Sequence, residues 1–173
     1  LGLCYEAGRG VPEDIHKAAE LYEQSGRLGY PEAQCNLGVL YRYGVGIPQD
    51  RDKAAAFFSQ AAERNFPRAQ FFLGLHYEYG EGVEKDPARA AELYAKAAEQ
   101  NFPEAVRALA VCCENGIGVE KDIQRAVTLY RRAVDLGDTS AAYCLANLYF
   151  GGRDVPQDYP QALALYEKAA AQG

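Results

Sequence analysis

The sequence predicts an all-α fold, a right-handed α-solenoid of about five helix-loop-helix repeats. Three observations support this prediction. A pattern of small, aromatic and acidic residues recurs every 36 residues without insertion or deletion. Apolar residues inside each copy follow helical spacing. The composition, with 49% hydrophobic and 24% charged residues, is that of an ordinary globular protein.

The repeat is defined by residues that return in the same register, and such periodicity is the signature of a repeat architecture. Each copy holds a leucine followed by glycine or alanine, then an aromatic residue, a glycine pair, an aspartate and an alanine. The leucines are Leu1, Leu37, Leu73, Leu109 and Leu145, and the aspartates are Asp14, Asp50, Asp86, Asp122 and Asp158. The array therefore occupies residues 1–173, with a truncated first copy at about 1–30 and further copies at 31–66, 67–102, 103–138 and 139–173.

Within each copy, local signals predict where the two helices begin and end. Pro31 suits the first turn of a helix, and Gly44 lies where a left-handed residue would end it. Asp50 is a good N-cap for the second helix. That helix is expected to end near Asn65, because asparagine and glycine tolerate a left-handed exit.

Small residues predict a close crossing of the two helices. We expect Gly38 to face Ala54, with the rings of Tyr41 and Phe58 filling the space beside the crossing. One helical hairpin cannot bury its apolar face alone, so the copies are expected to stack. At the ends of the array, Leu1, Leu3, Leu163 and Leu165 are candidates for exposed apolar surface, and end-to-end self-association is expected from them.

Charge and composition exclude several classes of function. The net charge of −6 disfavours nucleic acid as a partner, since phosphate binding needs a basic face. No apolar run is long enough for a transmembrane helix. The five cysteines are an odd number and favour buried thiols in a reducing, cytoplasmic setting. The sequence starts with Leu1, and we interpret it as a piece of a longer protein whose targeting signals can lie elsewhere.

These residues carry a resemblance to a known family. The string Ala33-x-x-x-Leu37-Gly38-x-x-Tyr41-x-x-Gly44-x-Gly46, joined to Asp50-x-x-Lys53-Ala54, is similar to the Sel-one-like repeats, a branch of the tetratricopeptide-like helical repeats. The resemblance covers nearly the whole chain. It implies a superhelical, non-catalytic scaffold or adaptor that binds another protein or a peptide. The alternative is a spacer or oligomerisation segment of a larger regulatory or secreted host-interaction protein.

In tetratricopeptide-like arrays the first helix of each pair lines the concave surface, so the free face of these helices is the predicted partner-binding site. Aromatic residues and arginines, which dominate interface hot spots, occur along it. Phe71 and Phe150 are open to a second interpretation, in which they fill gaps between repeats, whereas Tyr43 and Tyr79 are expected to be exposed. The predicted site residues are Arg42, Tyr43, Phe71, Leu75, Glu78, Tyr79, Arg107, Glu114, Tyr143, Asn147 and Phe150. Cys35 and Arg68 fall on the same face by phase.

Catalytic and metal chemistry have weak support. His76 and Cys112 occupy equivalent positions in successive copies, and stacking could bring them near Cys113, but packing is the preferred interpretation. The Gly-x-Gly pairs follow a helix and lack the lysine of a phosphate loop. We therefore expect no catalytic residue, metal or cofactor. A cysteine-rich branch of the family is linked to β-lactam binding or hydrolysis, yet Arg27 stands where the partner of Cys35 would be, so this function is a remote alternative.

Overall fold

Helices account for all the regular structure in residues 1–171, the part of the chain that the computed structural model describes. The chain divides into two compact units, Leu1–Asp86 and Pro87–Gly173. The all-α class predicted from the sequence is confirmed. No helix in the described range is long and apolar enough to cross a membrane.

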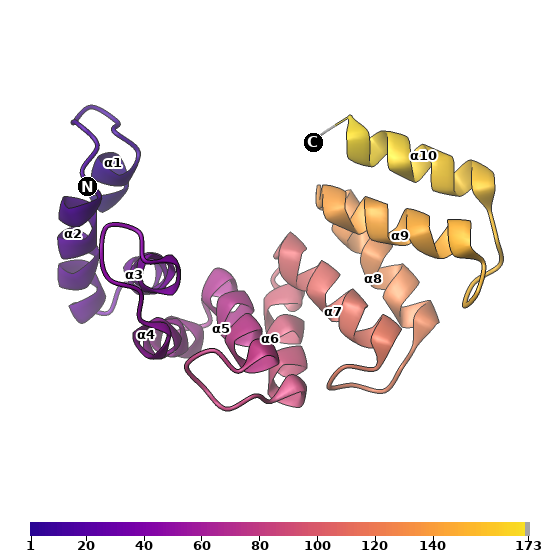
Figure 1. The fold of residues 1–173 in the computed structure, drawn as a ribbon, viewed down its shortest axis with the longest axis horizontal. Helices are drawn as coiled ribbons and strands as arrows, with labels where there is room; N and C mark the ends of the chain where they lie inside the picture. Colours follow the sequence, from indigo (N-terminus) through magenta and orange to yellow (C-terminus); the bar gives the residue numbers. More distant parts are fainter. Residues whose placement is uncertain (172–173) are drawn as a thin grey trace. The chain divides into compact units, whose positions relative to one another are not determined.

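In the first unit, helices that follow one another in sequence pack side by side (Figure 1). Its elements are α1 (Gly2–Glu6), α2 (Ile15–Arg27), α3 (Pro31–Tyr43), α4 (Arg51–Glu63) and α5 (Pro67–Tyr79).

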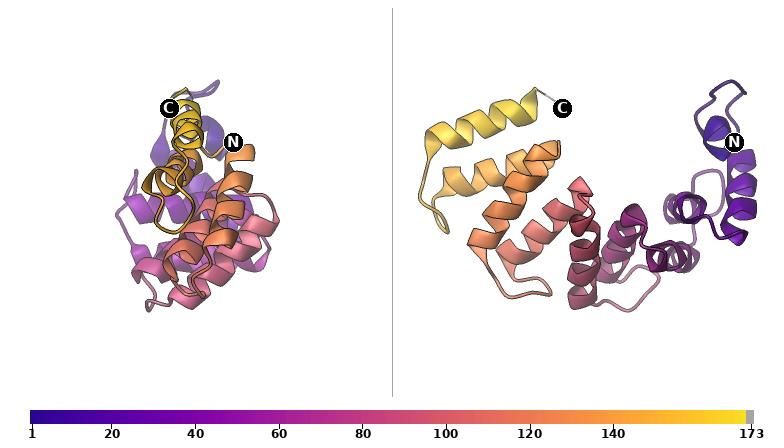
Figure 2. Two further views of the ribbon diagram at one scale, coloured as in Figure 1. Left: turned by 90° about the vertical axis from the view of Figure 1, so that its right-hand side faces the viewer. Right: turned by 180° about the vertical axis from the view of Figure 1, so that it is seen from behind.

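The second unit has the same arrangement, and both views of Figure 2 show α9 and α10 running side by side. Its elements are α6 (Pro87–Glu99), α7 (Pro103–Asn115), α8 (Ile123–Asp135), α9 (Thr139–Gly151) and α10 (Tyr159–Ala170).

The predicted helix boundaries are confirmed by the capping contacts. The carboxylates of Asp14, Asp50, Asp122 and Asp158 each accept a hydrogen bond of 2.9 Å from the backbone N–H three residues later. Such caps satisfy one of the free N–H groups at a helix start. Gly44, Gly80, Gly116 and Gly152 end the first helices in the left-handed conformation.

The second glycine of the pair has a packing role in the three middle copies, at Gly46, Gly82 and Gly118. A Cβ atom at Gly82 would lie 2.3 Å from the carbonyl oxygen of Arg51, and one at Gly118 would lie 2.0 Å from that of Pro87. Only glycine allows the loop to approach the start of the preceding second helix so closely. In the last copy Asp154 replaces this glycine, and its carboxylate instead pairs with Lys121 at 3.3 Å.

The close crossing of paired helices is present at Gly38. A Cβ atom there would lie 2.7 Å from the Phe58 ring, so this ring is the nearest side chain to the glycine. Tyr41 stacks beside the crossing on Phe57, with ring centroids 5.7 Å apart. A backbone trace can be predicted from the spacing, but which side chain covers a glycine depends on rotamers.

Of the four leucines predicted to be exposed at the ends of the array, three are exposed. Leu1, Leu3 and Leu163 are exposed. Leu165 is half-buried because it lines a pocket between α8 and α10. Apolar surface is therefore present on the first and last helices of the described chain.

Candidate functional site

The first helices of the first unit carry the clearest surface that could bind a partner. Tyr43 and Tyr79 occupy equivalent positions at the last turns of α3 and α5, with 58% and 61% of their surface exposed. The Arg42 guanidinium lies 5.6 Å from the centroid of the Tyr43 ring. Burial and the neighbouring Glu78 carboxylate raise the pKa of Tyr79. The phenol therefore remains a hydrogen-bond donor at neutral pH.

Arg42 is a supporting residue beneath these tyrosines. Only 12% of its side chain is exposed, and it pairs with Glu81 at 3.2 Å. Arg51 approaches the same carboxylate at 3.6 Å. These contacts join α3 to the loop after α5 and to the start of α4. The sequence placed Arg42 on the free face, yet its charge is largely used within the unit.

Further along the same face, half-buried side chains of α5 pack on α3. The Arg68 guanidinium donates a 2.9 Å hydrogen bond to the Asn36 side chain and lies 5.6 Å from the Phe72 ring centroid. Phe71 contacts Phe72 with ring centroids 5.6 Å apart. Like Phe71, Leu75 and Glu78 are half-buried. These residues form the less accessible part of the predicted surface.

One residue that the phase had placed on this face is not available. Cys35 is fully buried, and burial raises the pKa of its thiol to about 12. It packs as a small apolar residue on the inner side of α3.

In the second unit, the predicted charged residues hold the structure together. Arg107 Nε donates to the Asp138 carboxylate at 2.8 Å, and Asp138 also caps α9. The Tyr130 hydroxyl donates to Glu114 at 2.6 Å. Burial, followed by this carboxylate, raises the pKa of Tyr130. Arg107 and Glu114 are therefore committed to internal contacts.

The α9 residues on the predicted face are exposed but contact α10. Tyr143 lies against Tyr166, with ring centroids 5.7 Å apart, and Asn147 accepts a 2.6 Å hydrogen bond from the Tyr166 hydroxyl. Phe150 meets Tyr159 edge to face at 5.5 Å. The two interpretations of Phe150 combine here, because it is more than half exposed while also packing on the next helix.

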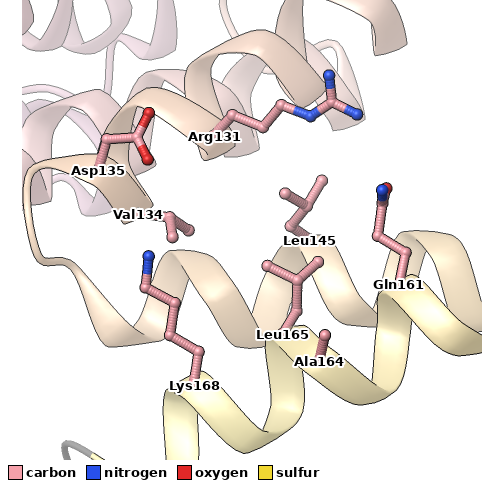
Figure 3. Close-up of a pocket in the computed structure, with 8 residues that line it drawn as sticks. All are labelled: Arg131, Val134, Asp135, Leu145, Gln161, Ala164, Leu165 and Lys168. Atoms are coloured by element: carbon pink, nitrogen blue, oxygen red, sulfur yellow. The ribbon is translucent and has the colours of Figure 1, made fainter.

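A pocket that the sequence had not predicted opens on the second unit. It is a cavity of about 400 Å³ between α8 and α10, with Leu145 of α9 in its lining. Figure 3 shows an apolar floor with charged side chains at the rim. Its lining residues are Arg131, Val134, Asp135, Leu145, Gln161, Ala164, Leu165 and Lys168.

The pocket is explained by a difference between successive repeats. One repeat earlier, Arg132 crosses the equivalent space and donates to the Ala98 carbonyl at 2.6 Å and to Asn101 at 2.7 Å. In the last repeat, Lys168 stands for Arg132 and Gly137 for Asn101. The Lys168 side chain makes no such bridge within residues 1–171. This pair of replacements is the signal in the sequence that could have revealed the pocket.

The histidine and cysteine side chains occupy packing positions. His76 is fully buried, with Nδ1 2.5 Å from the Glu81 carbonyl oxygen and its ring edge-on to Phe58. All five cysteines are free thiols. Among the described residues, no group of three or more His, Cys, Asp or Glu side chains could hold a metal ion.

Paired helices recur along the chain, and the first helices α3, α5, α7 and α9 each end on a left-handed glycine. The family model of the Sel1 repeat matches residues 1–30, 31–66, 67–102, 103–138 and 139–173. The chain belongs to the Sel1 repeat family. Sel1 repeat proteins are in general helical scaffolds for protein interactions. None of the curated proteins matches the chain.

Solved structures give the same fold. A Sel1 repeat protein from Oxalobacter formigenes is 35% identical with a TM-score of 0.91, over 99% of this chain and 70% of that one. A protective antigen of uropathogenic Escherichia coli, c5321, is 37% identical with a TM-score of 0.87; the match covers 99% of this chain but 37% of the antigen. Helicobacter pylori cysteine-rich protein B is 30% identical with a TM-score of 0.59, over 74% of this chain and 95% of that one.

Proposed function

We propose that this chain is a non-catalytic scaffold that binds a peptide or a partner protein on the free face of its first helices. The proposal is supported by Sel1 family membership and by the exposed tyrosines of that face.

The observation that carries the proposal is the pair Tyr43 and Tyr79. They recur at the same position in successive repeats of the first unit, and each is more than half exposed. The Arg42–Glu81 ion pair holds the Arg42 guanidinium in place beside the Tyr43 ring. Tyrosine offers a large amphipathic contact area at a low cost in conformational entropy. Two such side chains, held in fixed positions on the helices, would bind an extended peptide.

Affinity capture of partners tests this proposal. We expect the double substitution Tyr43→Ala with Tyr79→Ala to abolish capture of a partner that the unaltered chain retains. Tyr30→Ala is the matched control, because Tyr30 is equally exposed but lies at the opposite end of α3. Equal recovery by the double variant and the unaltered chain would place the binding site elsewhere.

Arg107 is unsuitable for this experiment although the sequence made it a candidate. Its guanidinium bonds to the N-capping carboxylate of α9, so Arg107→Ala would destabilise the second unit as well as remove surface charge. A loss of binding in such a variant would not distinguish the two effects.

A second candidate function is end-to-end self-association, as in a spacer or oligomerisation segment. The exposure of Leu1, Leu3 and Leu163 favours it. Sedimentation equilibrium over rising concentration tests it. A mass that stays monomeric would contradict self-association without affecting the scaffold proposal.

Hydrolysis of β-lactams has no support from the side chains. The cysteines are free and three of the five are buried. We expect a chromogenic lactam to remain unhydrolysed, and turnover that scales with protein concentration would contradict a non-catalytic role.

A further inference from the structure

The second unit carries a pocket that the proposed function does not use. It has a volume of about 400 Å³ and lies between the second helices α8 and α10, with Leu145 of α9 in its lining. Its volume is in the range of small-molecule sites, which are mostly apolar and hold a few placed polar groups. Helix α9 packs against both α8 and α10, so the pocket is formed within the described part of this unit.

The floor of the pocket is apolar and held in place by packing. Val134 of α8 and Leu145 of α9 are only 7% and 2% exposed. Leu165, which is half-buried, and Ala164 complete the floor from α10. A hydrocarbon chain lying over these side chains would take apolar surface out of water on both partners, which is favourable in proportion to the area covered.

The polar side chains are divided between the two ends of the pocket. Figure 3 shows Arg131 and Gln161 at one end and Asp135 and Lys168 at the other. The helical register agrees, because Arg131 precedes Asp135 on α8 as Gln161 precedes Lys168 on α10. From Gln161 to Lys168 the helix rises by about 10 Å, which sets the length of the pocket.

The two ends differ in charge. The Lys168 ammonium and the Asp135 carboxylate offset each other at one end. At the other end Arg131 is the charged lining residue, and Gln161 adds an amide that can donate. The Arg131 guanidinium donates one hydrogen bond of 2.6 Å to the Tyr149 hydroxyl, and a guanidinium has five N–H donors. This end is therefore suited to an anion.

One guanidinium and one amide match a single carboxylate, since hydrogen bonds from a cation to a carboxylate are stronger than neutral ones. An ammonium group at this end would be repelled by Arg131. A neutral hydrocarbon would remove water from the polar rim without offering new hydrogen bonds, which is unfavourable. The charges and the apolar floor together select a ligand with one anionic end and one apolar chain.

We propose that this pocket binds a small amphipathic carboxylate, an unbranched aliphatic acid such as octanoate. Its carboxylate would lie between Arg131 and Gln161, and its hydrocarbon chain would cross Leu145 and Leu165 toward Lys168. The pocket belongs to the second unit, whereas the exposed tyrosines of the proposed function belong to the first. Either proposal can therefore fail without the other.

The preceding repeat shows how the chain can close this space. There Arg132 donates to the Ala98 carbonyl and to the Asn101 side chain. The double substitution Lys168→Arg with Gly137→Asn restores both residue types in the last repeat. Asparagine is compatible with this position, because Asn101 itself adopts a left-handed φ of 60°. We call this double substitution the closing variant.

Nuclear magnetic resonance titration of the ¹⁵N-labelled chain with octanoate tests the proposal. Octanoate is used at neutral pH, where its carboxyl group is ionised, and below the concentration at which it forms micelles. We expect saturable shifts of the backbone amide signals of the lining residues. Octylammonium has the same chain with the opposite charge, and we expect its affinity to be lower by at least about tenfold.

Two variants test the ends and the space of the pocket separately. We expect Arg131→Gln and the closing variant each to lose at least about tenfold in affinity for octanoate. Arg125→Gln is the matched control, because it removes the same charge from an exposed arginine of α8 that does not line the pocket. It should bind octanoate as the unaltered chain does. Circular dichroism confirms that the variants keep their helix content.

Four results would overturn the proposal. These are an absence of saturable shifts, shifts that fall outside the lining residues, equal affinity for octanoate and octylammonium, or unchanged affinity in either Arg131→Gln or the closing variant. The comparison of octanoate with octylammonium uses the unaltered chain alone, so it holds even if a variant fails to fold.

Discussion

At the scale of single residues, one absent side chain controls how closely two helices approach. The Phe58 ring lies where a Cβ atom of residue 38 would be, at 2.7 Å, and Phe58 is fully buried among neighbours that cannot yield easily. We therefore expect Gly38→Val to lower the free energy of unfolding by about 1 to 3 kcal/mol through overpacking.

The matched control for Gly38→Val is Gly151→Val. Gly151 is also helical, but among the described residues a Cβ atom there would meet nothing within 4 Å apart from its chain neighbours and the backbone of its own helix. Denaturant unfolding followed by circular dichroism compares the two variants. If both variants lost the same free energy of unfolding, the loss would reflect helix propensity, and the close packing at Gly38 would contribute nothing to stability.

His76 makes the stability of the first unit depend on pH. Burial is the largest effect on its pKa and lowers it, while the bond to the Glu81 carbonyl oxygen opposes this and Arg42 and Arg51 lower it further. A carbonyl oxygen only accepts, so Nδ1 carries the proton, and the buried Nε2 has no hydrogen-bond partner among the described residues. Protonating Nε2 would place a charge beside the Phe58 ring.

The sign of the effect follows from the lowered pKa. The unfolded chain binds a proton near its ordinary value of 6.5, and the folded chain does so only at lower pH. The contribution of neutral His76 to the free energy of unfolding is fully present above about pH 6.5. It is lost as the pH falls toward the pKa of His76 in the folded chain. Unfolding free energies at pH 5 and 7.5 test this, with His76→Leu as control because leucine occupies the equivalent positions 40 and 148. An unchanged pH dependence in that variant would contradict the prediction.

At the scale of helices, Arg132 ties two successive second helices together. Its guanidinium reaches from α8 to the last turn of α6, where it donates to the Ala98 carbonyl and the Asn101 side chain. A cation at a helix C-terminus also interacts favourably with the helix dipole. We expect Arg132→Leu to cost about 1 to 3 kcal/mol of stability.

Lys168→Leu is the control for Arg132→Leu, because Lys168 holds the same register position on α10 and makes no such bridge in the described part of the chain. Thermal unfolding of both variants provides the comparison. A loss for Lys168→Leu as large as that for Arg132→Leu would show that the bridge contributes nothing beyond the helix surface.

The helices themselves were predictable from the sequence because their ends depend on local chemistry. Asp50 caps α4 and Gly44 ends α3 as expected, since both act on backbone groups within a few residues. The candidate site was predictable only in part. Helical phase identified Tyr43 and Tyr79 as exposed, but it cannot show that Arg42 pairs with Glu81 in the next repeat. Which partner a long charged side chain contacts depends on how far it extends in space, and the repeat register does not determine this.

At the scale of the whole chain, the rate at which the buried cysteine thiols react shows how readily each unit opens. All five are free, with Cys35 buried in the first unit and Cys112 and Cys113 buried in the second. Burial raises the pKa of Cys35, Cys113 and the half-buried Cys144. Because the thiolate is the reactive form, these thiols are protected twice: burial limits access of a reagent, and the raised pKa keeps the thiol protonated.

We therefore expect five thiols per chain to react with Ellman's reagent in denaturant without prior reduction. In the native protein we expect rapid reaction only at Cys4, which is half-buried near the start of the chain, and slow reaction of the others at the rate at which the units open. Cys4→Ser should remove the rapid phase alone. Fewer than five thiols in denaturant would reveal a disulfide and contradict the structure, whereas rapid native reaction of Cys35 or Cys113 would show that the helices covering them open far more readily than their burial implies.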